Sequence, residues 1–274
     1  MSVATIPTDS QLAEAFVAAA IEAGQAILAV RRKGYRAERK ADTTPVTEAD
    51  RAAEAVIMAH LRRIAPDLPV VAEEACSLGA VPSVGGQFLL VDPLDGTKEF
   101  VKGGDDFTVN IALIRDGAPA TGVVLAPASG VVYAGVAGHG AWRGSLVNGH
   151  VTERQPIHVR APGDALDIVA SKSHRTPETD AFCGRYNVRN LVAAGSSLKF
   201  CTVAEGKADL YPRMGTTMQW DTAAGDAVLR AAGGRTLTLD GAPLPYGPNG
   251  TGVEAYENPW FVASGDLELS LRGS

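Results

Sequence analysis

The 274-residue sequence has few cysteines, few aromatic residues and no excess of positive charge, and each scarcity excludes a class of protein. Its three cysteines are odd in number and widely separated (Cys76, Cys183 and Cys201), so they indicate neither a disulfide framework nor a zinc site. The formal net charge of −6 disfavours non-specific binding to nucleic acid or to an acidic membrane surface. A small anionic substrate remains compatible with this charge, because bound cations can reverse its sign locally.

Long apolar runs are also missing from the pattern, so we expect no segment with the apolar length of a membrane span and no stable membrane insertion. The N-terminal residues do not show a basic segment followed by an apolar core, which predicts that there is no signal peptide. Unpaired cysteines favour a reducing compartment, and we therefore predict a cytoplasmic protein. Apolar residues make up 46% of the chain, enough for a large core, and we expect a monomer or a homodimer.

Apolar periodicity and turn residues predict an α/β protein with an α+β first lobe over 1–155 and an α/β second lobe over 156–274. The boundary is placed in the polar, proline-containing stretch 152–162. We expect helices over 9–32, from Thr47 to Pro66, and over 177–186, 198–205 and 222–232. Strands are expected over 70–72, 88–91, 108–114, 121–125, 130–136, 139–143, 168–170 and 191–194.

The most informative segment is Asp92-Pro93-Leu94-Asp95-Gly96-Thr97, which follows the apolar strand 88–91. Pro93 restricts the backbone and Asp95-Gly96 predicts a tight bend. Two carboxylates placed three residues apart at a strand end can converge on one cation, and Thr97 adds a hydroxyl that could orient a water. These hard oxygen ligands are typical of a magnesium-dependent enzyme that cleaves phosphate esters. By itself, the segment would be equally typical of an acidic surface turn with a threonine cap.

Acidic residues stand at the ends of elements at five positions, namely Asp50, Glu73, Asp92, Asp95 and Asp221. Each one alone is better explained as a cap, a turn residue or a solvated charge. Their joint position at strand ends and helix starts, where clefts form in α/β proteins, favours a shared site. No Ser/His/Asp or Cys/His arrangement offers an alternative catalytic site.

Three motifs in order, Glu73-Glu74, Asp92 to Thr97 and Trp220-Asp221-Thr222-Ala223-Ala224-Gly225, resemble the inositol monophosphatase superfamily of magnesium-dependent phosphatases. The resemblance covers nearly the whole chain and implies the layered αβαβα sandwich of the inositol monophosphatase and fructose-1,6-bisphosphatase type. It also implies two or three Mg²⁺ ions, with ligands from Glu73, Asp92, Asp95, Asp221 and the main-chain carbonyl of Leu94. Thr97 and Asp50 would position a metal-activated water for direct attack on a phosphate monoester, and Glu74 would have a supporting role.

Four local segments are similar to the bacterial 3′(2′),5′-bisphosphate nucleotidase branch of this superfamily, namely 42–50, 97–100, 107–114 and 171–174. This resemblance implies removal of the 3′-phosphate from adenosine 3′,5′-bisphosphate, in the context of sulfur assimilation. It implies substrate contacts from Gly96, Thr97, His174, Ser196, Lys199, Arg213 and Asp221.

Alternatives remain for the roles of single residues and for the function of the protein. On residues alone, Lys199 could lie on a solvated helix face and Arg213 could form a surface pair with Asp209. The protein could be an inositol or histidinol monophosphatase on the same scaffold, or a sensor that binds a phosphonucleotide without turnover. A structural calcium module is disfavoured, because the regular spacing of a 12-residue calcium loop is missing.

Overall fold

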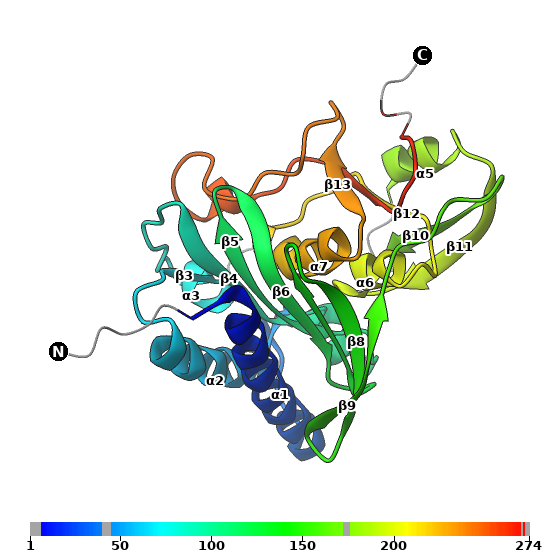
Figure 1. The fold of residues 1–274 in the computed structure, drawn as a ribbon. Coiled ribbons are helices and arrows are strands. Elements are labelled where there is room, and N and C mark those ends of the chain that lie inside the picture. Colours follow the sequence, from blue (N-terminus) through cyan, green and yellow to red (C-terminus); the bar gives the residue numbers. More distant parts are fainter. Residues whose placement is uncertain (1–6, 40–44, 172–175, 270, 272–274) are drawn as a thin grey trace.

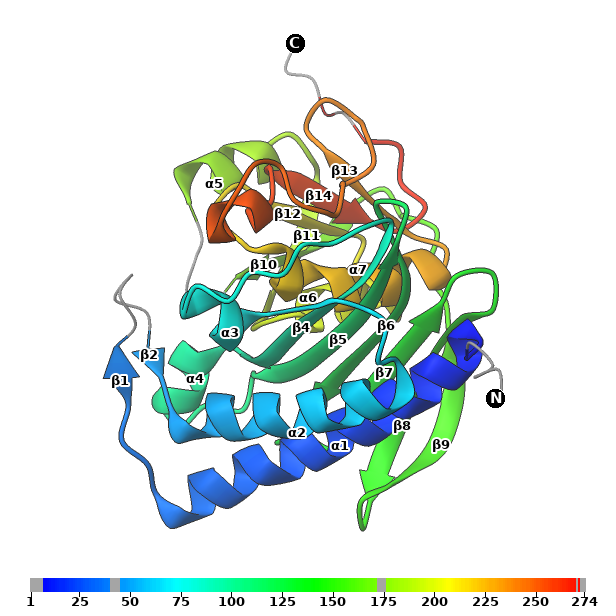
Figure 2. The same ribbon diagram turned by 90° about the vertical axis from the view of Figure 1, so that its left-hand side faces the viewer.

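The structure is a computed structural model that describes residues 7–39, 45–171, 176–269 and 271. Helices and sheets alternate in five layers, which confirms the predicted αβαβα sandwich (Figures 1 and 2). Helices α1 and α2 cover one face of a seven-stranded sheet, and α6 and α7 lie between that sheet and a five-stranded sheet. Helix α5 packs on the outer side of the second sheet.

The helices of the described chain are α1 (Asp9–Lys33), α2 (Glu48–Ile64), α3 (Glu73–Ser77), α4 (Thr97–Val101), α5 (Pro177–Cys183), α6 (Leu198–Ala204), α7 (Gln219–Ala231) and a 3-10 turn η1 (Val253–Tyr256). Both long N-terminal helices begin with a capping box, in which a threonine and a residue three positions later exchange hydrogen bonds. The cap of α2 is Thr47 with Asp50, as predicted. Helix α7 begins three residues before the predicted start, and α5 ends three residues before the predicted end.

The seven-stranded sheet has the order β3-β4-β5-β6-β7-β8-β9, with β3 parallel to β4 and all other pairs antiparallel. The five-stranded sheet has the order β11-β10-β12-β14-β13, with a parallel core of β11, β10 and β12. The strands are β1 (Glu38–Arg39), β2 (Pro45–Val46), β3 (Val70–Ala72), β4 (Gln87–Asp95), β5 (Thr108–Arg115), β6 (Ala118–Ala126), β7 (Val131–Val136), β8 (Gly140–Val147), β9 (His150–Ile157), β10 (Leu166–Ser171), β11 (Val188–Ala194), β12 (Leu210–Arg213), β13 (Arg235–Thr238) and β14 (Phe261–Ser264).

The segment 88–91 of strand β4 is apolar without interruption because both faces of the strand are covered by helices. Leu89 and Val91 pack toward α1 and α2, whereas Phe88 and Leu90 face the core shared with α6 and α7. A strand alternates its side chains between two faces, so burial on both sides requires a continuous apolar run. The layered arrangement therefore places the end of β4, with Asp92 and Asp95, deep inside the molecule.

One prediction about the chain is wrong, and another stays a prediction. By length and composition α1 is apolar enough to cross a membrane, so the expectation that no segment reaches this length is wrong. Its apolar residues include Phe16, Ala20 and Ile27, which are fully buried in the core between the helices and the first sheet. Such burial is typical of a core helix. The division of the chain into lobes at residue 155 stays a prediction, and β9 runs two residues past that point to Ile157.

Candidate active site

The end of β4 carries two carboxylates on one face because of a β-bulge. Asp92 is opposite Asn110 and Asp95 is opposite Thr108, so β4 advances three residues where β5 advances two. Residues three apart in a regular strand point to opposite faces, and the extra residue of the bulge brings Asp95 back to the face of Asp92. The convergence predicted for this pair therefore rests on the bulge as well as on the following bend.

Gly96 makes the bend after Asp95 and begins helix α4. Its φ of +92° lies in the left-handed region, and a Cβ at this position would stand 2.8 Å from the main-chain oxygen of Asp106. Only glycine meets both demands without strain. The chain can therefore turn from Asp95 into α4 within one residue and present Thr97 at the helix start.

Asp50, at the start of α2, faces Thr97. The Thr97 hydroxyl lies 3.0 Å from Asp50 Oδ1 and 3.0 Å from the carbonyl oxygen of Leu94, and can donate to either. The other carboxylate oxygen of Asp50 accepts hydrogen bonds from the amide and the hydroxyl of Thr47, at 2.7 and 2.8 Å. Burial raises the pKa of Asp50, while the bonds from Thr47 act in the opposite direction. The predicted pairing of Thr97 with Asp50 is thus present as a direct contact.

Glu73 is the first residue of α3, which is fixed by a carboxylate from another helix. Glu54, on α2, accepts hydrogen bonds from the amides of Glu74 at 2.9 Å and Ala75 at 3.1 Å. A carboxylate at a helix N-terminus satisfies amides that have no partner inside the helix. Sequence reasoning did not identify Glu54, which lies twenty residues before the motif it supports.

Asp221 lies in the first turn of α7, as predicted, where its Oδ2 accepts from the amide of Met218 at 2.9 Å. Burial raises the pKa of Asp221 to about 8, and the charges of Asp95 and Glu73 act in the same direction. Burial likewise raises the pKa of Asp95 to about 6, against the opposing effect of the Lys199 charge. The acidic motifs, far apart in sequence, therefore share one electrostatic environment.

Asp92 is buried as deeply as Asp50, with 1% of its surface exposed. Its pKa is raised well above the usual range by burial, and further by the charges of Glu73, Asp95 and Asp221. Asp92 Oδ1 accepts a hydrogen bond from the uncharged amide of Leu94 at 3.0 Å. Removing several carboxylates from water without a compensating positive charge is unfavourable.

The donor set fits a hard divalent cation by its chemistry. It consists of carboxylate oxygens and the Leu94 carbonyl, and oxygen ligands of this kind suit Mg²⁺ rather than zinc or copper. In the described part of the chain, no group of three or more His, Cys, Asp or Glu side chains is already placed to hold a metal ion. A cation would therefore have to draw these side chains together.

Lys199 and Arg213 supply positive charge from the second half of the chain. They are 6% and 8% exposed, so the alternatives of a solvated helix face and a surface pair are wrong. The carboxylate of Asp209, suggested as a partner for Arg213, is instead bound by Arg160 at 2.7 Å. Burial lowers the pKa of Lys199 to about 8, against the charge of Asp95 that favours its protonated form.

Two buried polar atoms beside these cations have no hydrogen-bond partner among the described residues, namely Ser196 Oγ and Arg213 Nε. Arg213 Nη2 donates to the carbonyl of Thr216, at 2.8 Å, which holds the guanidinium while Nε stays unpaired. Buried donors of this kind normally have partners, so they fit an anionic ligand. Ser196, Lys199 and Arg213 are therefore buried where they could bind an anion, and their role as substrate contacts stays a prediction. His174 lies outside the described residues.

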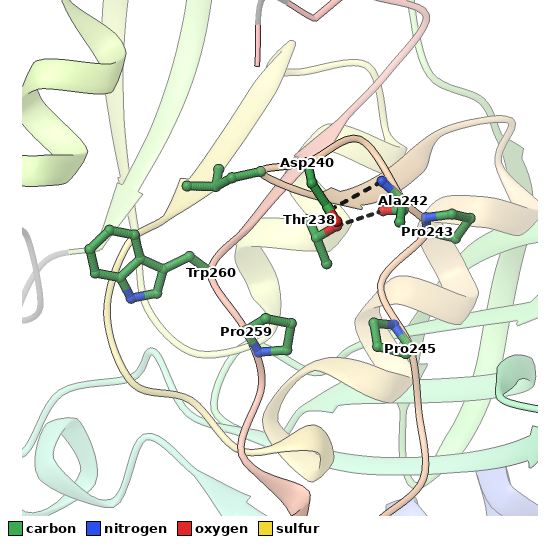
Figure 3. Close-up of a pocket in the computed structure, with 8 residues that line it drawn as sticks. Thr238, Asp240, Ala242, Pro243, Pro245, Pro259 and Trp260 are labelled. Carbon is green, nitrogen blue, oxygen red and sulfur yellow. Dashed lines mark hydrogen bonds between the residues drawn. The ribbon is translucent and has the colours of Figure 1, made fainter. Parts of the chain in front are cut away.

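A pocket of about 510 Å³ lies elsewhere, beside β13 and the start of β14 (Figure 3). Its lining is rich in proline and includes the exposed Trp260, with Asp240 as its acidic residue. Figure 3 shows Thr238 and Asp240 hydrogen-bonded to Ala242 across the turn rather than pointing into the hollow as a ligand set. None of the predicted site residues lines this pocket, so it is separate from the acidic site.

Comparison with known proteins gives concordant results. The model of the inositol monophosphatase family matches residues 8–266. The 3′(2′),5′-bisphosphate nucleotidase CysQ of Escherichia coli strain K12 is 46% identical over 225 residues, covering 82% of this chain and 87% of the relative. The CysQ protein of Salmonella typhimurium is 44% identical over 241 residues, covering 87% and 94%. The crystal structure of CysQ from Bacteroides thetaiotaomicron superposes with a TM-score of 0.77 at 37% identity, covering 94% of this chain and 98% of that one.

Proposed function

Because the chain belongs to the inositol monophosphatase family, we propose that it is a magnesium-dependent 3′(2′),5′-bisphosphate nucleotidase. The proposed reaction removes the 3′-phosphate of adenosine 3′,5′-bisphosphate and yields AMP and phosphate. One observation carries the proposal beyond the family: buried carboxylates with raised pKa values are coupled electrostatically to the buried cations Lys199 and Arg213. A site with this division of charge suits a substrate with one phosphate to cleave and a second to hold.

The acidic side would bind the metal. Glu73, Asp92, Asp95, Asp221 and the carbonyl of Leu94 are the proposed ligands, for two or three Mg²⁺ ions. When bound, the metal supplies positive charge for the phosphate oxygens and lowers the pKa of water at the site. It would also neutralise the repulsion that, together with burial, raises the pKa values of Asp92, Asp95 and Asp221.

Thr97 and Asp50 would orient the attacking water and take its proton. When the Thr97 hydroxyl donates to Asp50 Oδ1, its oxygen is free to accept a hydrogen bond from water. Proton transfer from water to Thr97, with transfer of the Thr97 proton to Asp50, leaves the water oxygen able to form a bond to phosphorus. The bond from phosphorus to the 3′-oxygen then breaks, and that oxygen takes a proton from solvent. The pKa of Asp50, raised by burial, makes it a better base than an exposed aspartate.

Lys199, Arg213 and Ser196 would hold the second phosphate. Arginine offers a planar pair of donors and lysine a point charge, which together suit a phosphate dianion. Gly96, Thr97 and Asp221 are the proposed contacts to the phosphate that is cleaved, and His174 is a proposed contact to the nucleotide. A cytoplasmic location and a role in sulfur assimilation complete the proposal.

The test is a phosphate-release assay with adenosine 3′,5′-bisphosphate, inositol 1-phosphate and histidinol phosphate, each with magnesium and with a chelator. We expect turnover only with magnesium and the highest kcat/KM for the bisphosphate. A clear preference for inositol 1-phosphate or histidinol phosphate would assign the protein to the alternative monophosphatase activity. Tight binding of the bisphosphate without any turnover would instead support the sensor.

The role of Arg213 sharpens this assay. Losing a charge-assisted contact typically reduces binding by roughly 10–100-fold, so Arg213→Ala should raise KM for the bisphosphate by about that factor. It should scarcely change the rate on a small monophosphate, which lacks the second phosphate. Arg62, an exposed residue on α2, provides the matched control Arg62→Ala. Equal losses on both substrates would contradict the assignment of Arg213.

A further inference from the structure

Two buried polar side chains outside the predicted ligand set connect both halves of the acidic site. They are Asn110, on β5, and Ser197, immediately before α6. Each is only 1% exposed, which is unusual for these residue types unless they have a specific polar role. Asn110 lies in the segment 107–114 that resembles the nucleotidase branch, but neither residue is among the predicted metal ligands or substrate contacts.

Ser197 makes three contacts that join segments far apart in the sequence. Its amide donates to Asp95 Oδ2 at 2.7 Å, its hydroxyl donates to the main-chain carbonyl of Asp221 at 2.6 Å, and its hydroxyl accepts from Asn110 Nδ2 at 3.0 Å. Asn110 Nδ2 also makes a longer contact of 3.5 Å to Asp95 Oδ2. The result is a closed path from the carboxylate of Asp95, through Ser197, to the backbone that carries the carboxylate of Asp221.

The turn before α6 is itself held in place from both sides. Gly195 packs against Asp106 so closely that a Cβ would stand 2.6 Å from the Asp106 Cβ. Ser196 has a φ of +45°, an unfavourable value for a residue with a side chain, and its carbonyl accepts from Lys199 Nζ at 2.6 Å. Strain of this kind persists only where the surroundings fix the backbone, so Ser197 is presented to Asp95 in one position.

The path crosses between the layers of the fold. Asp95 and Asn110 belong to the first sheet, whereas Ser197 directly precedes α6 and Asp221 belongs to α7, in the layer behind that sheet (Figure 2). Two carboxylates that share a cation must keep a fixed spacing, although they repel each other and stand on separate elements. Hydrogen-bonded groups that support the ligands of a metal commonly set this geometry.

We propose that Asn110 and Ser197 are positioning residues, which hold the Asp95 carboxylate and the start of α7 in register so that both can bind one cation. They touch neither substrate nor metal themselves and act through Asp95 and Asp221. The inference rests on the proposed metal-dependent function, and it adds the residues that align the two halves of the site.

The first variant is Ser197→Ala, which removes the hydroxyl and its two hydrogen bonds but keeps the amide that donates to Asp95. Ser264→Ala is the matched control, because Ser264 is fully buried in β14 and its hydroxyl has no partner among the described residues. Calorimetric titration with Mg²⁺ should show about tenfold weaker binding for Ser197→Ala, and binding like that of the wild type for Ser264→Ala.

Comparison of the Mg²⁺ affinity with the rate at saturating Mg²⁺ distinguishes a positioning role from general damage to the site. In Ser197→Ala the Mg²⁺ concentration for half-maximal phosphatase activity should rise about tenfold, while the rate at saturating Mg²⁺ stays within about twofold of the wild type. A loss of rate that saturating Mg²⁺ does not restore would overturn the proposal. Metal binding equal to that of the wild type would also overturn it.

Asn110→Ala provides the second arm and tests the same path from β5, even if Ser197→Ala does not fold. Asn110→Ala should also weaken Mg²⁺ binding. The double variant should lose little more Mg²⁺ affinity than the single variant with the larger loss, because both residues act through one path. Full additivity of the two effects would overturn the proposal.

The outcomes also separate this inference from the proposed function. A wild type that binds Mg²⁺ but hydrolyses no bisphosphate would overturn the function, while weaker binding in Ser197→Ala would still support the positioning role. An active wild type whose Mg²⁺ affinity is unchanged by Ser197→Ala would overturn the positioning role alone. A wild type that binds no Mg²⁺ would overturn both.

Discussion

Among the carboxylates of the described residues, two groups have their negative charges balanced in opposite ways. In the second half, Asp167 and Asp209 are bound by Arg160 at 2.6 and 2.7 Å, and Arg189 adds a further pair with Asp167. These guanidinium groups, through their hydrogen bonds, hold the pKa of Asp167 below its usual range. That group is complete without a ligand.

The acidic site shows the opposite pattern. Asp92 is as buried as Asp167 and Asp209, whereas Asp95 and Asp221 are half-buried, yet burial and mutual repulsion raise the pKa values of all three. Lys199 offsets this effect only in part. The comparison teaches that burial alone does not identify a functional carboxylate, and that the groups facing it, arginines in one place and further carboxylates in the other, separate an ion pair from a site that lacks a cation.

The largest expected effect comes from removing one charge at the acidic site. Asp95→Asn keeps the shape of the side chain but deletes a proposed metal ligand, so the phosphatase rate should fall by several orders of magnitude, on the order of 10³-fold or more. The stability of the metal-free protein should be unchanged or slightly higher, because one repelling charge has been removed. Steady-state kinetics and thermal unfolding in chelator measure the two quantities. A folded Asp95→Asn protein with normal turnover would contradict the ligand assignment.

The next effect separates water activation from metal binding at the same site. Thr97→Ala deletes the hydroxyl that lies between Asp50 and Leu94, and should lower kcat by about 10²–10⁴-fold. The affinity for Mg²⁺, measured by calorimetry, should stay nearly intact. If metal binding disappears together with activity, Thr97 is a ligand or a structural residue and not a positioning group for water.

In the group formed by Asp167 and Asp209, loss of one carboxylate should lower the stability and leave the rate unchanged. Asp209→Asn leaves the guanidinium of Arg160 with one charged partner fewer, and should destabilise the fold by about 3 kcal/mol, the lower end of the range for broken buried pairs, because Arg160 is partly exposed. Equilibrium unfolding in denaturant measures this loss. The rate per folded molecule should not change. A variant that kept its stability but lost its rate would remove the distinction between the two groups.

Local patterns in the sequence predicted the main helices, the α/β character and the acidic motifs, whereas the layered sandwich followed from the family resemblance. The metal-binding and catalytic roles of the acidic residues stay predictions. Asp92 and Asp95 could be predicted to converge, but the β-bulge that brings them to one face depends on pairing with β5. Strands β1, β2, β9, β12, β13 and β14 were not predicted. Five of these have two to four residues, and a segment of that length carries too little periodicity.

The sequence could not predict whether a single polar residue is buried or exposed. Lys199 and Arg213 were equally compatible with exposure and with burial, and tertiary packing decides between these states. Asn110 stands between Val109 and Ile111 in the segment 108–114, where Thr108 is the other polar residue, and this irregularity was a signal that could have drawn attention to it. Its partner Ser197 is 87 residues away, so the bond between them leaves no local pattern.

The contrast between the two groups predicts an unusual pH dependence for the metal-free protein. Below pH 6 the folded chain holds protons on both Asp221 and Asp95, and between pH 6 and pH 8 on Asp221, because their pKa values are about 8 and about 6, whereas the unfolded chain has released both above about pH 4. Stability should therefore fall as pH rises, by roughly 1.4 kcal/mol per pH unit for each proton still held. The lowered pKa of Lys199, about 8, acts in the opposite sense only above that pH.

The most direct test of a cation site is thermal unfolding at pH 5 and pH 8, in chelator and with Mg²⁺. In chelator we predict a Tm at pH 8 that is about 5–10 °C lower than at pH 5. Mg²⁺ should raise Tm far more at pH 8, where the carboxylates are ionised and protons do not compete with the metal. A Tm that rises from pH 5 to pH 8 in chelator, and does not respond to Mg²⁺ at pH 8, would contradict the account.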